Sequence, residues 1–474
     1  MDATRDRGPF RFWSSDMTSS FEPTHSDSTG ANVLAGGLRE VTALAYPVVL
    51  TQLSATLMGV VDSAMVGRLG PTYLAAAGFG SIWLWTIFSF FYGTASGVQT
   101  FVSQRDGAGQ PEQTGRWIWQ GFFSVVPMAA LTAILLAPWV VPALALLGPS
   151  TELQTQSAAY IGARLPGEVG MAAWMVFTSF YRGIGDTRTP LWIGLFVNAL
   201  NAVLDYGLIF GHLGLPEWGI EGAATATAIS QWVGAIAMLV MLRRRRLRDP
   251  YRTDLVAPQL DAMRRFLRIG IPIGGQWCVG MTSFAMFTTL VARMGDESMA
   301  ASQAFVMLLS LSFMQAIGIS VAASTLVGRY VGARRPDAAR RSFNNSILLG
   351  VLLGVLIAVL FVAIPGPLLR IFTDDPDVVR LGRPLLLIGA LFQLVDAVAI
   401  ITQGALRGAG DTRWPFVIET TFGWLVFVPL AYMLGVSFEL GLWGAWLGGL
   451  IALTLSASVL ALRFRSGAWE RIRI

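Results

Sequence analysis

The chain is 474 residues long, and 54% of its residues are hydrophobic while only 13% are charged, so it is too apolar for a soluble cytosolic enzyme. One cysteine and two histidines exclude intramolecular disulfides and metal centres built from cysteine or histidine. The formal net charge of +5 is carried by arginine alone, and without lysine the chain cannot form the phosphate loop of an ATP-driven pump.

Residues 1–35 are rich in Ser, Thr, Asp and Gly and contain no apolar stretch, so we expect a disordered cytoplasmic tail and no signal peptide. Beyond this tail, apolar segments long enough to cross a bilayer recur to the end of the chain. The predicted spans are 41–66, 75–103, 117–147, 155–181, 189–211, 219–242, 268–292, 299–328, 344–369, 380–405, 415–436 and 441–463. Continuous apolar runs of this kind favour membrane helices over a β-barrel.

The arginines predict the orientation of the chain. If the N-terminus is inside, most arginines fall in the inner segments, which places both termini in the cytoplasm. We expect the chain to lie in the inner (plasma) membrane. The densest block, from Arg243 to Arg268, lies in the connection between spans six and seven. We interpret it as a topology anchor that contacts anionic lipid head groups, and not as a nucleic-acid site.

An internal repeat divides the chain into two halves. Arg182-Gly-Ile-Gly-Asp-Thr-Arg-Thr-Pro190 recurs as Arg407-Gly-Ala-Gly-Asp-Thr-Arg-Trp-Pro415, a shift of 225 positions (407 against 182) that other matched residues share. Residues 36–242 and 268–474 each hold six spans, joined by a basic cytoplasmic linker, 243–267. Because six is even, a pseudo-two-fold axis along the membrane normal should relate the two lobes, with a cavity between them. We interpret the repeated blocks as helix caps.

Ionisable and amide side chains inside apolar spans mark a candidate site, because each needs a partner, a wet cavity or a role. Gln52 and Asp62 fall on one face of span one, and Asn198, Asn201 and Asp205 fall on one face of span five. We expect the two faces to line the cavity and to meet in the outer half of the membrane. Their oxygens suit H⁺, an organic cation, or Na⁺ held by Asp62, Asn201 and Asp205.

The second half has fewer acidic candidates. Asp396, with two glutamines on the same span, is a candidate second cation site. In the first half, Arg164 and Glu168 are four residues apart and should form a structural ion pair. Glu419 lies near the inner end of span eleven, and we expect it to extend toward the head groups.

These residues resemble the multidrug and toxic compound extrusion (MATE) family over about residues 38–465. The similarity lies in the first span, Ala45 to Gly67, in the paired Arg-Gly-x-Gly-Asp-Thr-Arg-x-Pro blocks, and in Gly270-Ile-Pro-Ile-Gly-Gly-Gln276. The resemblance implies an all-α protein of twelve transmembrane helices in two lobes. It also implies export of cationic, often aromatic compounds in exchange for Na⁺ or H⁺. We expect a monomer with no cofactor besides the coupling ion.

The resemblance carries over to single residues from two branches of the family. Asp62 matches the first-helix aspartate of prokaryotic members, and Asn201 and Asp205 match an Asn-x-x-x-Asp pair of the DinF-like branch. Asp396 looks like the tenth-helix aspartate of the NorM-like branch. Gly280 stands where many NorM-like members have a glutamate, which argues against a second site built on that glutamate and slightly favours H⁺ as the coupling ion.

The expected function is therefore a secondary antiporter that exports organic cations or drugs by alternating access. A lipid-linked oligosaccharide flippase is an alternative, although it would call for cationic residues in the cavity, whereas the intramembrane charges here are mainly acidic. An ion channel is an alternative from a different class, and it would show conductance that is not coupled to a substrate.

Overall fold

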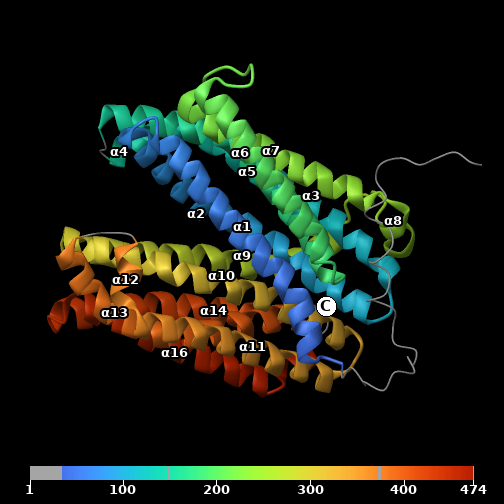
Figure 1. Cartoon of the computed structure of the whole chain (residues 1–474). Coiled ribbons are helices and arrows are strands. Elements are labelled where there is room, and N and C mark those ends of the chain that lie inside the picture. The colour runs from blue at the N-terminus through green and yellow to red at the C-terminus, as the bar shows by residue number, and fades with distance from the viewer. Residues whose placement is uncertain (1–34, 148–149, 372–374, 473) are drawn as a thin grey trace, which may run out of the picture. The chain divides into compact units, whose positions relative to one another are not determined.

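The computed structural model describes residues 35–147, 150–371, 375–472 and 474, and within these ranges every regular element is a helix (Figure 1). The predicted tail, residues 1–35, lies outside the described residues except for Ala35. Ten of the described helices are long and apolar enough to cross a membrane. The remaining two predicted spans correspond to helices of 33 residues each, α5 and α9, which carry more polar side chains. The prediction of twelve membrane helices is confirmed.

Six spans make up the first half, and the sequence explains where they begin and end. Its elements are α1 (Leu38–Gly67), α2 (Pro71–Gly107), η2 (Pro111–Gln113), α3 (Thr114–Leu136), η3 (Ala137–Trp139), α4 (Val140–Leu147), α5 (Thr151–Gly183), α6 (Arg188–Phe210) and α7 (Gly219–Leu242). Ser150 begins α5 by accepting a hydrogen bond from the Leu153 amide. Gly211 ends α6 with a left-handed backbone conformation. The predicted third span is broken at η3, which contains a proline.

The second half repeats this order with an irregular eleventh span. Its elements are α9 (Leu260–Ala292), α10 (Asp296–Gly332), α11 (Pro336–Ala363), α12 (Pro365–Arg370), α13 (Pro376–Ala409), α14 (Arg413–Thr421), η4 (Phe422–Phe427), α15 (Val428–Tyr432), η5 (Met433–Ser437), α16 (Gly441–Arg465) and η6 (Ala468–Arg471). The segments η4 and η5 are π-helical, a wide-turn geometry that is frequent at functional sites.

The linker between the halves is fastened to the first half. It contains the short helix α8 (Arg245–Tyr251), and its following residues bond to α3. Trp119 Nε1 donates to the Thr253 carbonyl oxygen at 3.1 Å, and Gln120 Nε2 donates to the Ala257 carbonyl oxygen at 3.0 Å. The arginines of 243–246 remain exposed, so they are accessible to other molecules.

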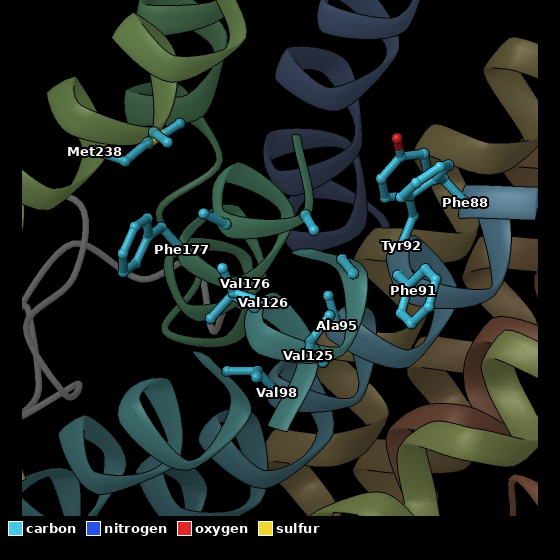
Figure 2. Packing of buried hydrophobic residues seen from close by; sticks show 14 of the residues in the cluster. Phe88, Phe91, Tyr92, Ala95, Val98, Val125, Val126, Val176, Phe177 and Met238 are labelled. Carbon is cyan, nitrogen blue, oxygen red and sulfur yellow. The ribbon is translucent and has the colours of Figure 1, made fainter. Parts of the chain in front are cut away.

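Each half contributes its first helix to the apolar core of the other half. A large core cluster lies among α2, α3, α5 and α7, and Figure 2 shows its packing around Phe88, Tyr92 and Phe177. Buried residues of α9, among them Phe266 and Ile273, belong to this cluster of the first half. Conversely, the α1 residues Val41, Leu44 and Ala45 belong to a cluster with α10, α11, α13 and α16 of the second half.

The contacts that each first helix makes with the other half occur at equivalent positions of the internal repeat. A Cβ atom on Gly93 of α2 would lie 2.8 Å from the Gly274 Cα of α9, and one on Gly318 of α10 would lie 2.9 Å from the Val49 nitrogen of α1. Gly318 and Gly274 lie 225 positions after Gly93 and Val49 (318 against 93, 274 against 49). The repeat seen in the sequence is therefore also a repeat of helix contacts.

Candidate functional site

Three of the predicted site residues meet where α1 approaches α6. Asn201 Nδ2 donates to Asp205 Oδ2 at 3.0 Å, and the exposed fractions of these residues are 5% and 0%. Because they are four residues apart, they lie one turn apart on the same face of α6. Asp62 of α1 is hydrogen-bonded to Asp205 as well. A bond between two carboxyl groups requires that one of them carry a proton.

This carboxyl pair keeps two oxygen atoms without a donor. Asp62 Oδ1 and Asp205 Oδ1 are buried and have no hydrogen-bond partner among the described residues. A buried carboxylate oxygen without a partner is costly, so the site gains stability from a proton or a cation placed there. The group formed by Asp62, Asn201 and Asp205 is called the N-half carboxyl site below.

An ion pair of α5 accompanies the N-half carboxyl site. Arg164 Nε lies 3.3 Å from Glu168 Oε1, and Tyr92 of α2 donates a hydrogen bond to Glu168. The pair exists as its spacing predicts, but the Arg164 guanidinium also attracts the Asp62 and Asp205 carboxylates electrostatically. Sequence reasoning missed this proximity, because nothing in α5 alone indicates which helix it faces.

Two predicted site residues, Asn198 and Gln52, form hydrogen bonds outside the N-half carboxyl site. Asn198 Nδ2 donates to Ser54 Oγ at 2.7 Å, which ties α6 to α1 away from the aspartates. Gln52 Nε2 approaches the Met314 Sδ of α10 at 3.8 Å, so this part of α1 faces the second half. The structure therefore brings Asp62, Asn201 and Asp205 together and leaves Asn198 and Gln52 outside their hydrogen-bond network.

The second half places Asp396 near a different carboxylate. Glu419 is the charged neighbour of Asp396, and Gln403 Nε2 donates to Glu419 Oε2 at 3.2 Å. The prediction that Glu419 extends toward the head groups is wrong, because the Gln403 amide of α13 holds its carboxylate inside the second half. Across the described ranges, no group of three or more His, Cys, Asp and Glu side chains gathers that could hold a metal ion.

Comparison with known proteins identifies the family. The family model MatE matches residues 47–207 and 272–433, one match in each half of the repeat. The chain belongs to the MatE family. The "Probable multidrug resistance protein NorM" of Thermotoga maritima is 32% identical to this MatE protein over 439 residues, which cover 91% of this chain and 93% of the relative. The resemblance to MATE transporters is confirmed, and the protein is a multi-pass membrane transporter and not an enzyme.

Solved structures share the fold of this MatE protein. A eukaryotic MATE transporter, AtDTX14, superposes with a TM-score of 0.81 at 22% identity and covers 92% of this chain and 98% of its own. A MOP superfamily transporter from Pyrococcus furiosus gives a TM-score of 0.84 at 20% identity over 92% of this chain and 97% of its own. The Vibrio cholerae MATE transporter VcmN gives a TM-score of 0.83 at 21% identity over 91% of this chain and 98% of its own.

The repeated blocks of this MatE transporter join its two halves. Thr100 Oγ1 of α2 donates to the Arg407 carbonyl oxygen at 3.0 Å, and Thr325 Oγ1 of α10 donates to the Arg182 carbonyl oxygen at 2.9 Å. Thr325 and Arg407 lie 225 positions after Thr100 and Arg182, so one bond is the repeat of the other. The blocks were predicted to be helix caps, and Asp186 does accept a bond from the Thr189 amide at 2.9 Å. They also form the contact between halves at the side predicted to be cytoplasmic.

One ion pair in this contact has no counterpart in the repeat. Arg329 Nη2 lies 3.1 Å from Asp106 Oδ2 and 2.9 Å from the Ile184 carbonyl oxygen, to which it donates. The exposed side-chain fractions of Arg329 and Asp106 are 19% and 17%, so water screens the pair only partly. The position that corresponds to Asp106 in the second half is Val331, which cannot form an ion pair.

Replacing Asp106 by Asn should therefore loosen the contact between the halves. Losing one partner of a partly buried ion pair should raise the population of molecules with separated α2 and α10 ends about fivefold or more. Spin labels on cysteines at Glu112 and Arg335, in a Cys278→Ser background, would report the separation by pulsed electron paramagnetic resonance. The reversed pair Asp106→Arg with Arg329→Asp should recover part of the short-distance population. Identical distance distributions in Asp106→Asn and its parent would contradict this role.

Proposed function

We propose that this protein is a secondary antiporter that exports organic cations in exchange for an inward-moving ion. The observation that carries the proposal is the N-half carboxyl site: two hydrogen-bonded aspartates, one fully buried, with unpartnered oxygens inside a membrane transporter. A buried site of this charge favours occupancy by one positive species at a time. Arrival of a cationic substrate and departure of the ion are therefore linked.

Alternating access requires that the contact between the halves open and close. At the side predicted to be cytoplasmic, the paired threonine bonds join α2 to α13 and α10 to α5, and the Arg329–Asp106 ion pair joins the ends of α2 and α10. We propose that this arrangement belongs to the state that is closed toward the cytoplasm. A ligand shifts the equilibrium between states only by its differential affinity for them, so the ion and the substrate should favour different states.

H⁺ is the coupling ion that we propose. The Asp62 and Asp205 carboxyl groups are close enough to share a proton, and Arg164 adds a fixed positive charge nearby that disfavours a second cation. Na⁺ would need further oxygen ligands besides Asp62, Asn201 and Asp205.

Efflux from reconstituted vesicles tests the function and the ion together. Vesicles loaded with a fluorescent organic cation would receive a pH gradient alone, then a Na⁺ gradient alone, each at zero membrane potential. Efflux under the pH gradient only is the expected result. Efflux under the Na⁺ gradient only would reassign the ion, and equal efflux without either gradient would contradict antiport and favour a channel.

We further propose that the transporter works as a monomer in the inner membrane, with both termini in the cytoplasm and with anionic lipids around the arginines of 243–246. The exposed, arginine-rich linker supports this orientation. A reporter enzyme that is active only in the cytoplasm, fused after Ile474, should be active. An inactive but intact fusion would reverse the orientation.

A further inference from the structure

The residues that follow α16 fold back against the second half. Gly467 turns the backbone with a left-handed conformation, and η6 begins at the next residue. Trp469 of η6 is only 1% exposed, stacks on Phe464 and donates through Nε1 to the Phe464 carbonyl oxygen at 2.7 Å. Glu470 forms an ion pair with Arg340 of α11 at 2.7 Å. The segment η6 is therefore anchored to the second half.

Two isoleucines beyond η6 reach the contact between the halves. A Cβ atom on Gly410, just after α13, would lie 3.2 Å from Ile474 Cγ2 and 3.5 Å from Ile472 Cγ2. Arg105 Nη2, near the end of α2, donates to the Ile474 backbone oxygen at 3.2 Å. The Ile474 side chain also packs against the apolar cluster of the first half. Ile474 therefore touches both halves, and Ile472 and Ile474 together are called the tail below.

The tail lies where the internal repeat lacks an ion pair. At the equivalent place in the first repeated block, a Cβ atom on Gly185 would lie 2.9 Å from Nη2 of Arg329, the arginine of the ion pair between the halves. Gly410 is the repeat of Gly185 (410 against 185), and Arg329 is the repeat of Gln104 (329 against 104). Gln104 Nε2 donates to a backbone oxygen of the second block at 2.9 Å, but it carries no charge. The tail thus supplements the contact that has no arginine.

The attachment of the tail to the first half is weak enough to be reversible. Ile472 has an extended backbone, and both isoleucines are half-buried. Within the described part of the chain, a single hydrogen bond, from Arg105, joins the tail to the first half. Segments with few buried contacts open at a low cost in free energy while the rest of the fold stays intact. The tail can therefore leave the first half while η6 remains in place.

The equivalent position in the second half makes a more permanent contact. Tyr330 is the repeat of Arg105 (330 against 105), and its hydroxyl donates to Glu40 Oε2 at 2.7 Å. Glu40 lies in the first turn of α1, directly before residues that are buried in the core of the second half. This contact is fixed by the packing of a whole helix, whereas the tail has no such helix beyond it.

We propose that the tail is a latch that holds the halves together at the side predicted to be cytoplasmic and must leave the first half before this side opens. The inference rests on the alternating access of the proposed function. Arg105 moves with the first half, whereas η6 moves with the second, so separation of α2 from α13 pulls the tail away from Arg105. Because the latch contacts exist only in the closed state, they lower the population that is open to the cytoplasm.

Shortening the chain tests the latch. A chain that ends at Arg471, with spin labels on cysteines at Glu112 and Arg335 in the Cys278→Ser background, should show about fivefold more molecules at long distance than its full-length parent. This is the change expected from losing one hydrogen bond in a two-state equilibrium. Unchanged distances in the shortened chain would overturn the latch.

Point variants separate the latch from a general effect of shortening. Ile474→Ala removes only the apolar contact, and Arg105→Gln weakens the hydrogen bond, so each should shift the distances in the same direction by a smaller amount. The exposed Arg465→Gln is the matched control for loss of an arginine nearby and should leave the distances unchanged. Equal shifts in Arg465→Gln and Arg105→Gln would assign the effect to charge alone and overturn the latch.

A crosslink tests whether the tail must be released. Cysteines in place of Arg105 and Ile474, in the Cys278→Ser background, would be joined by a short cleavable bismaleimide. Coupled efflux should stop after crosslinking and return after cleavage, and Ile474→Cys treated alone is the control. Continued efflux from the crosslinked protein would overturn the latch. The distance measurements need no gradient, so failure of efflux in the parent would overturn the antiporter proposal and leave the distance result standing.

Discussion

Asp205→Asn should abolish ion-coupled efflux while leaving the protein folded in the membrane. Asparagine keeps the size and one oxygen of aspartate, so it can still accept from Asn201 and contact Asp62, but it cannot bind and release a proton. Because couplings between two ligands typically amount to about 1–3 kcal/mol, we expect efflux driven by a pH gradient to fall at least about tenfold. The measurement is dye efflux from vesicles that contain equal amounts of parent and variant protein.

Asn198→Ala is the matched control for this variant. Asn198 lies on the same helix, but it donates to Ser54 and not to the aspartates. Its replacement should remove one hydrogen bond, with a cost of about 1 kcal/mol to stability, and should retain most of the coupled efflux. Asp62→Asn should behave like Asp205→Asn. Normal coupled efflux from both aspartate variants would remove the N-half carboxyl site from the mechanism.

Gly107→Val should prevent the halves from closing at the side predicted to be cytoplasmic. A Cβ atom on Gly107 of α2 would lie 1.9 Å from the Arg329 backbone oxygen of α10, and one on Gly332 would lie 2.0 Å from the Gln104 backbone oxygen of α2. Backbone atoms cannot move aside as a flexible side chain can, so the two helices must separate. Overpacking of this kind costs about 1–3 kcal/mol, which should lower the closed population at least about fivefold.

The spin-label pair at Glu112 and Arg335 measures this change directly. Gly107→Val should shift the distance distribution to longer values, and coupled efflux should fall with it. Gly78→Val on the same helix is the matched control, because nothing lies within 4 Å of a Cβ atom there. A closed distance distribution in Gly107→Val would contradict the prediction, as would an open one in Gly78→Val.

The helices could be predicted from the sequence because long apolar runs leave the backbone no other way to satisfy its hydrogen bonds in lipid. The proximity of Asp62 and Asp205 could also be predicted from the sequence, since both lie near the ends of helices that run in the same direction. The hydrogen bond from Asn198 to Ser54 could not be predicted, because it depends on how α6 is rotated against α1. Whether an amide three residues from Asn201 turns toward the aspartates or away from them is decided by packing.

The Glu419 carboxylate shows the same limit more clearly. Its position near the end of the span suggested contact with head groups. Instead, the Gln403 amide, sixteen residues earlier on the neighbouring helix, donates a hydrogen bond to it. The proximity of Arg164 to the N-half carboxyl site likewise depends on contacts among α1, α5 and α6. Local spacing predicts pairs within one helix, such as Arg164 and Glu168, whereas contacts between helices require the fold.

The exchange of first helices between the halves bears on how such a protein could arise. Val41, Leu44 and Ala45 complete the core of the second half, and Phe266 and Ile273 complete that of the first. An ancestor of half this length with the same packing would have left one apolar surface uncovered on its own. Only by pairing with a second identical chain could it have covered that surface, so gene duplication and fusion would have made permanent an association that already existed.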